Sequence, residues 1–229
     1  MAAPENPRQH LYLLIALLLL IIAAPIVVPL RHGILVINVI GATVLILASY
    51  AVSDRKDFLA VAIIFSAATV IANSFLLVYP SHVSVVIAHS SMIFILGFFA
   101  VSILGYVVHS GRVTADRIYA AICAYLLIGY AWAFGYALFD EFQPGAFAAA
   151  TEVARNDYIG RVNQMRYFSF ITLATVGYGD IVPRTAGART MAILEAIVGQ
   201  FCLVALIGRL VGLHIVHGSS SQRAEVQRD

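Results

Sequence analysis

Six consecutive residues, Thr-Val-Gly-Tyr-Gly-Asp at 175–180, combine types that suit neither a helix nor a strand. Gly177 and Gly179 can adopt a positive φ at little cost, and they alternate with bulkier residues. This alternation lets successive carbonyl groups turn to the same side of an extended chain, where their oxygens lie about 3 Å apart. The hydroxyl of Thr175 adds one more oxygen to this column. We therefore expect the backbone of 175–180 to offer oxygen ligands to a cation that has lost its hydration water.

The rest of the chain has the composition of a membrane protein. Of its 229 residues, 61% are hydrophobic and 11% are charged, whereas soluble domains carry about 25% charged residues. A helix needs roughly 20 apolar residues to cross the hydrocarbon core. Six stretches approach or exceed that length: Leu11–Leu30, Ile34–Val52, Phe58–Tyr79, Val83–Val108, Ile118–Phe139 and Met191–Ile215. The sequence predicts an all-α membrane protein with six transmembrane helices.

Arg and Lys in the short loops indicate the orientation, because cytoplasmic loops carry an excess of these residues. If the amino terminus is inside, the outer loops up to the fifth span hold Arg31. The inner loops then hold Arg8, Arg55, Lys56, Arg112 and Arg117. Both termini are therefore predicted to be cytoplasmic, in the inner or plasma membrane of a cell. The first span could also be a signal peptide, but its apolar run exceeds the roughly 7–15 residues usual there.

The segment between the fifth and sixth spans then faces outward and has two parts. Asp140–Gln164 is mixed in composition and is predicted as a surface loop. Met165–Thr175 is apolar but too short to cross, which is typical of a re-entrant helix. The non-helical backbone after it must border protein, water or ions, because unpaired N–H and C=O groups in lipid cost several kcal/mol each.

The stretch TLATVGYGD at 172–180 resembles the selectivity-filter signature of potassium channels, the best-known carbonyl filter. The likeness spans roughly 118–215, and Ala174 departs from it because many members have Thr there. It implies a homotetramer in which each chain supplies one quarter of the pore. The implied K⁺ ligands are Thr175, Val176, Gly177 and Tyr178, followed by Gly179, with Asp180 at the outer mouth.

An aromatic contact and a helix end are expected to hold this segment in place. The resemblance implies that Tyr178 points away from the axis and packs near Tyr167 or Phe168. The carboxyl end of the re-entrant helix, near Ala174, is expected to point at the pore centre. A helix end carries about half a negative charge, so four such ends would favour a waiting cation.

Two residues of the last span are further candidates. Glu195 is an acid inside a membrane span, which is costly and indicates a function. It either lines the cavity or hydrogen-bonds Ser169 or Thr172 behind the filter, and the second is favoured because a partner offsets its burial. Gly199 lies one turn further on and resembles the glycine hinge of bacterial potassium channels. It is either a gating hinge or a small residue required for helix packing.

The first four spans lack the arginines of a voltage sensor. Gating charges recur at every third residue of a fourth helix, but Val83–Val108 contains no Arg or Lys. His89 in this span is interpreted as a packed neutral side chain or as a pH sensor. Asn73 in the third span is predicted to form a hydrogen bond between helices.

The expected domains are a cytoplasmic amino terminus (1–10), a four-helix membrane domain (11–109), a cytoplasmic linker (110–117), a pore domain (118–215) and a short cytoplasmic tail (216–229). No grouping of residues indicates an enzyme, a nucleic-acid partner or a cofactor other than K⁺ ions in the filter. The sequence thus predicts a passive, potassium-selective homotetrameric channel whose partners are K⁺ and membrane lipid. The alternatives are a weakly selective cation channel and a non-conducting sensor or regulatory subunit of another channel.

Overall fold

The computed structural model describes residues 8–28, 33–52, 56–109, 114–149, 153–154 and 157–226. In these ranges the chain forms the helices α1 (Gln9–Val27), α2 (Gly33–Ala51), α3 (Lys56–Val78), α4 (His82–His109), α5 (Ala115–Phe142), α6 (Tyr158–Leu173) and α7 (Ala186–Val226). Two short strands, β1 (Phe147–Ala149) and β2 (Ile181–Pro183), complete the described structure.

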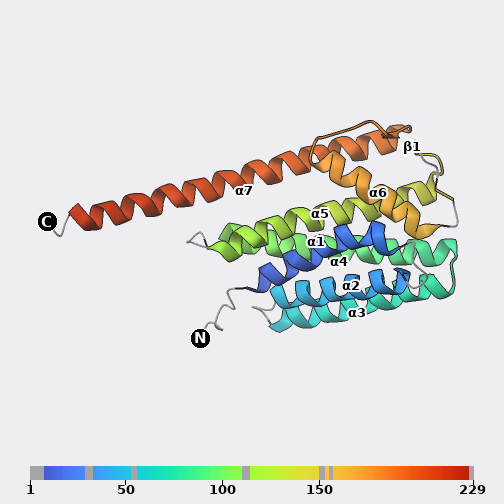
Figure 1. The fold of residues 1–229 in the computed structure, drawn as a ribbon, viewed down its shortest axis with the longest axis horizontal. Coiled ribbons are helices and arrows are strands. Elements are labelled where there is room, and N and C mark those ends of the chain that lie inside the picture. The colour runs from blue at the N-terminus through green and yellow to red at the C-terminus, as the bar shows by residue number, and fades with distance from the viewer. Residues whose placement is uncertain are drawn as a thin grey trace.

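Six of these helices, all except α6, are long and apolar enough to cross a membrane. They lie side by side as a bundle in Figure 1, and α7 extends past the ends of the others. The start of α1 and the end of α7 are at the same end of the bundle, whereas α6 and β1 are at the opposite end. The protein is therefore an all-α, multi-pass membrane protein, as the sequence predicted. Arg31, Arg55 and Arg112, on which the predicted orientation depends, lie outside the described residues.

Several predicted boundaries were wrong. The re-entrant helix starts at Tyr158 rather than Met165, so it includes part of the predicted surface loop. The last helix starts at Ala186 rather than Met191 and continues through Val226, into the predicted tail. The fifth helix starts at Ala115, which places Arg117 in its first turn instead of in a loop. Arg117 is buried there, with its guanidinium over the ring of Tyr106.

Asp157 explains the early start of α6. Its side chain accepts a hydrogen bond from the Gly160 N–H at 2.8 Å, which satisfies one of the unpaired donors at a helix start. Hydropathy did not predict this start, because the first turns of α6 contain polar residues. Such residues are tolerated there because the helix borders protein on more than one side. Asp157, a residue type that often caps helices, was the feature of the sequence that could have predicted this start.

The main core lies between α1, α2, α4 and α5, and α4 and α5 form the most extensive helix pair. His89 of α4 is buried in this region, with its ring 5.6 Å from that of Phe134. Asn73 of α3 donates to the Thr69 carbonyl of its own helix at 2.9 Å. The predicted hydrogen bond of Asn73 between helices was therefore wrong, since its amide satisfies the preceding turn instead.

A second core lies beneath the 175–180 segment. It is formed by aromatic and apolar side chains of α5, α6, α7 and the two strands, including Tyr136, Phe147, Phe168, Ile181 and Met191. The strands pair in antiparallel register, with Ala148 opposite Val182. The Arg184 N–H also donates to the Ala146 carbonyl at 2.8 Å. This small sheet, which the sequence did not predict, ties the chain after residue 180 to the loop after α5.

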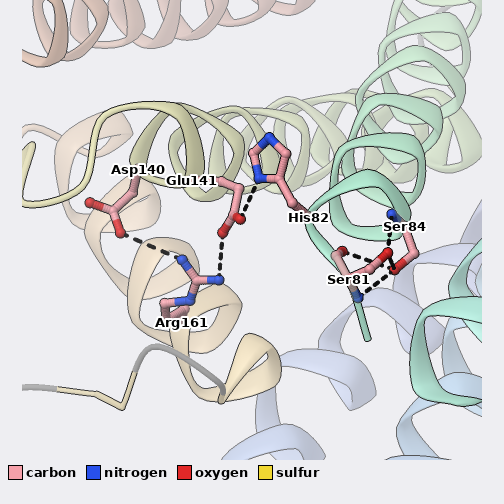
Figure 2. Close-up of polar contacts among 6 residues, drawn as sticks. All are labelled: Ser81, His82, Ser84, Asp140, Glu141 and Arg161. Carbon is pink, nitrogen blue, oxygen red and sulfur yellow. Dashed lines mark hydrogen bonds and ion pairs between the residues drawn. The ribbon is translucent and has the colours of Figure 1, made fainter. Parts of the chain in front are cut away.

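An ion-pair cluster joins three helices, α4, α5 and α6, at the end of the bundle where β1 lies (Figure 1 and Figure 2). Arg161 of α6 contacts Glu141 of α5 at 2.8 Å and Asp140 at 3.8 Å. His82 of α4 contacts the other carboxylate oxygen of Glu141 at 2.7 Å. Glu141 thus connects the first turn of α4 to α6.

The turn before α4 is closed by two serines, also drawn in Figure 2. The Ser81 N–H donates to the Ser84 hydroxyl at 2.9 Å, and the Ser84 N–H lies 3.2 Å from the Ser81 hydroxyl. This reciprocal capping follows Pro80 directly and satisfies donors at the start of α4. It places His82 at the helix start, beside Glu141.

Replacing Arg161 with Gln is expected to lower the unfolding temperature of the purified protein by several degrees. The change leaves the Glu141 side chain, only 9% exposed, without its main cation, and breaking such a pair costs about 3 kcal/mol. Thermal unfolding in detergent measures the effect. Arg189→Gln is the control, because Arg189 is exposed and donates to a single carbonyl, that of Pro183. Equal shifts in the two variants would contradict the role of the cluster.

Candidate functional site

The 175–180 segment follows α6 directly and has no regular secondary structure up to Asp180. Its backbone alternates in handedness, because φ is +55° at Thr175, +54° at Gly177 and +80° at Gly179. Positive φ was expected at the two glycines but not at Thr175, which is the one non-glycine residue with positive φ in the described chain. This conformation is costly for a side chain with a branched Cβ.

The N–H groups at the start of this segment turn back to α6. The Thr175 N–H donates to the Thr172 carbonyl at 2.9 Å, and the Val176 N–H donates to that of Ile171 at 2.9 Å. The Gly177 N–H also approaches the Ile171 carbonyl, at 3.4 Å. Within the described residues, no hydrogen bond reaches the carbonyl oxygens of 175–178. The first N–H donors of the segment are thus satisfied by α6, whereas these four carbonyls have no partner among the described residues.

The side chains of the segment lie on the surface of the single chain. Tyr178 is 71% exposed and Val176 is 49% exposed. Asp180 accepts a hydrogen bond from the Tyr167 hydroxyl, which ties the end of the segment back to α6. Phe168, by contrast, is buried on the other side of α6 and packs against Tyr136 at 5.0 Å between ring centroids. Phe168 therefore supports α6 from behind and does not pack on Tyr178.

Glu195 of α7 is fully buried between α5 and α6. The Tyr136 hydroxyl of α5 donates to its Oε2 at 2.5 Å, and the Ser169 hydroxyl of α6 lies 2.5 Å from its Oε1. The structure thus places Glu195 behind the segment and beside Ser169, rather than beside Thr172. Thr172 contributes its carbonyl, which accepts the Thr175 N–H.

The hydrogen atoms around Ser169 indicate the protonation state of Glu195. The Ser169 hydroxyl also lies 2.7 Å from the Gly129 carbonyl, and a hydroxyl has one proton to donate. Both short contacts are hydrogen bonds only if the Glu195 carboxyl carries a proton and donates it to Ser169. The ion pairs of the described residues include none with Glu195. A neutral carboxyl avoids the cost of an unpaired buried charge.

Gly199 lies against the last residue of α6. A Cβ added to Gly199 would be 2.5 Å from the Leu173 carbonyl oxygen, and the same oxygen accepts a hydrogen bond from the Tyr125 hydroxyl at 3.1 Å. The helix α7 runs without interruption through this position. The structure shows a packing contact at Gly199, and a role as a gating hinge stays a prediction.

Three further residues belong to this support, and two of them, Tyr125 and Tyr136, had no role assigned from the sequence. Tyr125 and Tyr136 both hold partners of the segment and are eleven positions apart, which is about three helical turns on one face of α5. That spacing was the available signal. Gln200, next to Gly199, approaches the Thr175 hydroxyl with its amide nitrogen at 3.4 Å.

The comparisons with known proteins agree with this site. The profile of a family described as ion channels matches residues 146–213, which contain α6, the 175–180 segment and α7 as far as Leu213. Potassium channel protein kcv of Paramecium bursaria Chlorella virus 1 is 35% identical over 66 residues, which are 29% of this chain and 70% of that protein. The chain belongs to the ion channel family. Protein LctB of Bacillus caldotenax is 29% identical to the channel over 100 residues, 44% of this chain and 74% of that protein.

No solved structure matches the channel significantly. Membership of the ion channel family indicates a transport protein rather than an enzyme. The matched region excludes α1 to α5, so the family likeness concerns the module around the 175–180 segment.

Glu195→Ala is expected to destabilise the channel by about 2 kcal/mol. It leaves the buried Tyr136 hydroxyl without a partner and leaves Ser169 with the Gly129 carbonyl alone. Glu195→Gln should behave almost like the wild type, since a neutral amide keeps an acceptor and a donor at the same place. Thermal unfolding and cation flux in liposomes measure both. If Glu195→Gln proves as damaging as Glu195→Ala, the carboxyl of Glu195 is ionised in the wild type and does not donate a proton to Ser169.

Gly199→Ala is expected to reduce cation flux strongly and to lower the unfolding temperature. The added methyl group, placed 2.5 Å from the Leu173 oxygen, must displace the last turn of α6 and the segment that follows it. Gly208→Ala is a matched control in the same helix, because a Cβ there meets no atom within 4 Å. Normal flux through the Gly199 variant would show that the contact is not required.

Proposed function

We propose that this protein is a potassium-selective channel, in which residues 175–179 form the filter and Asp180 lies at its outer mouth. The observation that supports this most directly is the alternating backbone. Its first N–H groups bond α6, and the carbonyls of 175–178 have no partner among the described residues. Peptide oxygens arranged in this way can replace the hydration shell of K⁺. The viral relative with 35% identity, whose name describes a potassium channel, is consistent with this ion.

A single chain supplies one side of such a filter, so the proposal requires several copies around an axis. The resemblance to potassium-channel filters implies four. The exposed apolar surface of the chain is compatible with this. Val176 and Tyr178 are exposed, as are Ile193, Ile197 and Phe201, which recur every four residues along α7. In the assembly these side chains would face neighbouring subunits, and the carbonyls would face the axis.

The support behind the filter would then keep its oxygens at a fixed spacing. Glu195 joins α7 to α5 and α6, and Gly199 allows α7 to approach the end of α6. The carboxyl end of α6 would point toward the ion path, where its partial negative charge favours a cation. Conduction would be passive, with ions displacing one another between adjacent sites.

We further propose that the protein lies in the inner or plasma membrane with both termini in the cytoplasm. The six spans bring the start of α1 and the end of α7 to one end of the bundle (Figure 1). The opposite end, with α6 and the small sheet, would face outward.

Gly177→Ala and Gly179→Ala are each expected to abolish selective K⁺ flux. A Cβ at these positions strains a backbone with φ of +54° and +80° and turns the carbonyl away from the axis. Uptake of K⁺ and Na⁺ into liposomes, with and without barium, measures selectivity and block.

Gly145→Ala provides the matched control for that experiment. Gly145 also has a φ of +80° and lies in the loop before β1, so the substitution carries the same backbone strain away from the filter. The control should keep selective flux even if the protein becomes less stable. Normal K⁺ selectivity in both filter variants would contradict the proposed mechanism, as would the absence of barium-sensitive flux in the wild type.

A further inference from the structure

A cavity of about 150 Å³ lies inside the chain, between the four-helix region and α6. Its walls come from α1 to α6, and they are mainly aliphatic and aromatic. Cavities of about this volume hold one small apolar molecule in other proteins. The space suits a single alkyl chain better than the whole of a two-chain lipid.

Polar groups line part of this cavity. Arg166 and Asn163 of α6, His89 of α4 and Tyr130 of α5 all border it. His89 is 3% exposed, and its Nδ1 has no hydrogen-bond partner among the described residues. Tyr130 lies beside Arg166 and is also buried. Asn38 of α2 and Asn73 of α3 line it as well. The cavity thus combines an apolar body with polar groups, and its polar region around Arg166 and Tyr130 belongs to α6 and α5.

Arg166 gives this polar region a positive charge. Its guanidinium forms no ion pair with a carboxylate of the described residues, since the acidic partners found there belong to Arg161, His10 and His82. A cation within a membrane domain is costly unless it has a counter-charge or water. An anionic group bound in the cavity would supply that counter-charge.

The cavity borders α6 along one face of that helix. Tyr158, Val162 and Arg166 recur at intervals of four residues, and all three line the cavity. Ser169 lies on the same face, two turns after Val162, and contacts the Gly129 carbonyl and Glu195. Phe168 lies on another face and packs against Tyr136. Arg166 is seven residues, or about two turns, before the end of α6 at Leu173. An occupant of the cavity would therefore touch the helix that supports the filter.

We propose that this cavity is a binding site for a single-chain amphiphile with an anionic head group, which regulates conduction through α6. The head group, a carboxylate or phosphate, pairs with Arg166 beside Tyr130, and His89 lines the same cavity. The alkyl chain fills the apolar part between α2 and α4. This ligand site is separate from the ion path, so binding does not depend on the proposed function, whereas the regulation of conduction rests on it.

Calorimetric titration of the purified, full-length protein in detergent tests the site without any measurement of conduction. Decanoate is expected to bind, and decanol, with the same chain and no charge, is expected to bind at least about tenfold more weakly. Arg166→Gln should weaken decanoate binding by about the same factor and leave decanol binding unchanged. Arg166→Lys should retain most of the affinity for decanoate.

A cavity-filling variant tests the location independently of the charge. Gly41 lines the cavity, and a Cβ there meets no atom within 4 Å, so Gly41→Leu can fill the space. Gly97→Leu is the matched control, because Gly97 is also helical with no atom within 4 Å of an added Cβ and does not line the cavity. Decanoate binding should be lost in the first variant and kept in the second, with circular dichroism showing that both are folded.

Competition with dioleoylphosphatidylglycerol identifies the source of the ligand. If this lipid displaces decanoate, an acyl chain of a membrane lipid occupies the site, and if it does not, a free fatty acid does; both results support the shared chemistry. The proposal is overturned if decanoate and decanol bind equally, if Arg166→Gln binds decanoate like the wild type, or if Gly41→Leu still binds it. Each of these results is independent of whether the protein conducts K⁺.

Discussion

The structure depends on how the backbone polar groups after α6 are satisfied. A non-helical segment at membrane depth must find partners for every N–H and C=O group. Here the N–H groups of Thr175 and Val176 return to carbonyls of α6. The carbonyls of 175–178 are left unpaired within the described chain, and φ is positive at alternate residues. The segment is thus only partly satisfied by its own helix, and in the proposed function a cation completes it.

The support around α6 follows from this constraint, because the carbonyls keep their spacing only if α6 does not move. Three helices contribute to it through few atoms. The buried carboxyl of Glu195 joins α7 to Tyr136 and Ser169, and Ser169 also contacts the Gly129 carbonyl of α5. Gly199 and Tyr125 meet the same Leu173 oxygen from two sides. Beyond these contacts, the Glu141–Arg161 pair ties the start of α6 to α4 and α5.

The sequence predicted some of these features and not others, and the physical reason differs in each case. Hydropathy located all six spanning helices, because each must cover the same thickness of hydrocarbon. It missed the first two turns of α6, whose polar residues are held by the Asp157 cap and by Arg161. It also missed the end of α7 beyond Ile215, where no lipid constrains composition. The β1–β2 pair was not predictable, since three-residue strands leave no periodic pattern.

By itself the sequence determined that the protein lies in a membrane, how many spans it has and where the 175–180 segment stands between them. These follow from local composition and from the two glycines, which need no distant partner. Only the tertiary structure decided that Glu195 points behind the segment, that Phe168 packs away from Tyr178 and that Gly199 touches Leu173. The tertiary structure also revealed a cavity with Arg166 on its wall. Each of these depends on which faces of α5, α6 and α7 meet. Helix periodicity defines the faces of one helix, but rotation and separation come from packing between helices.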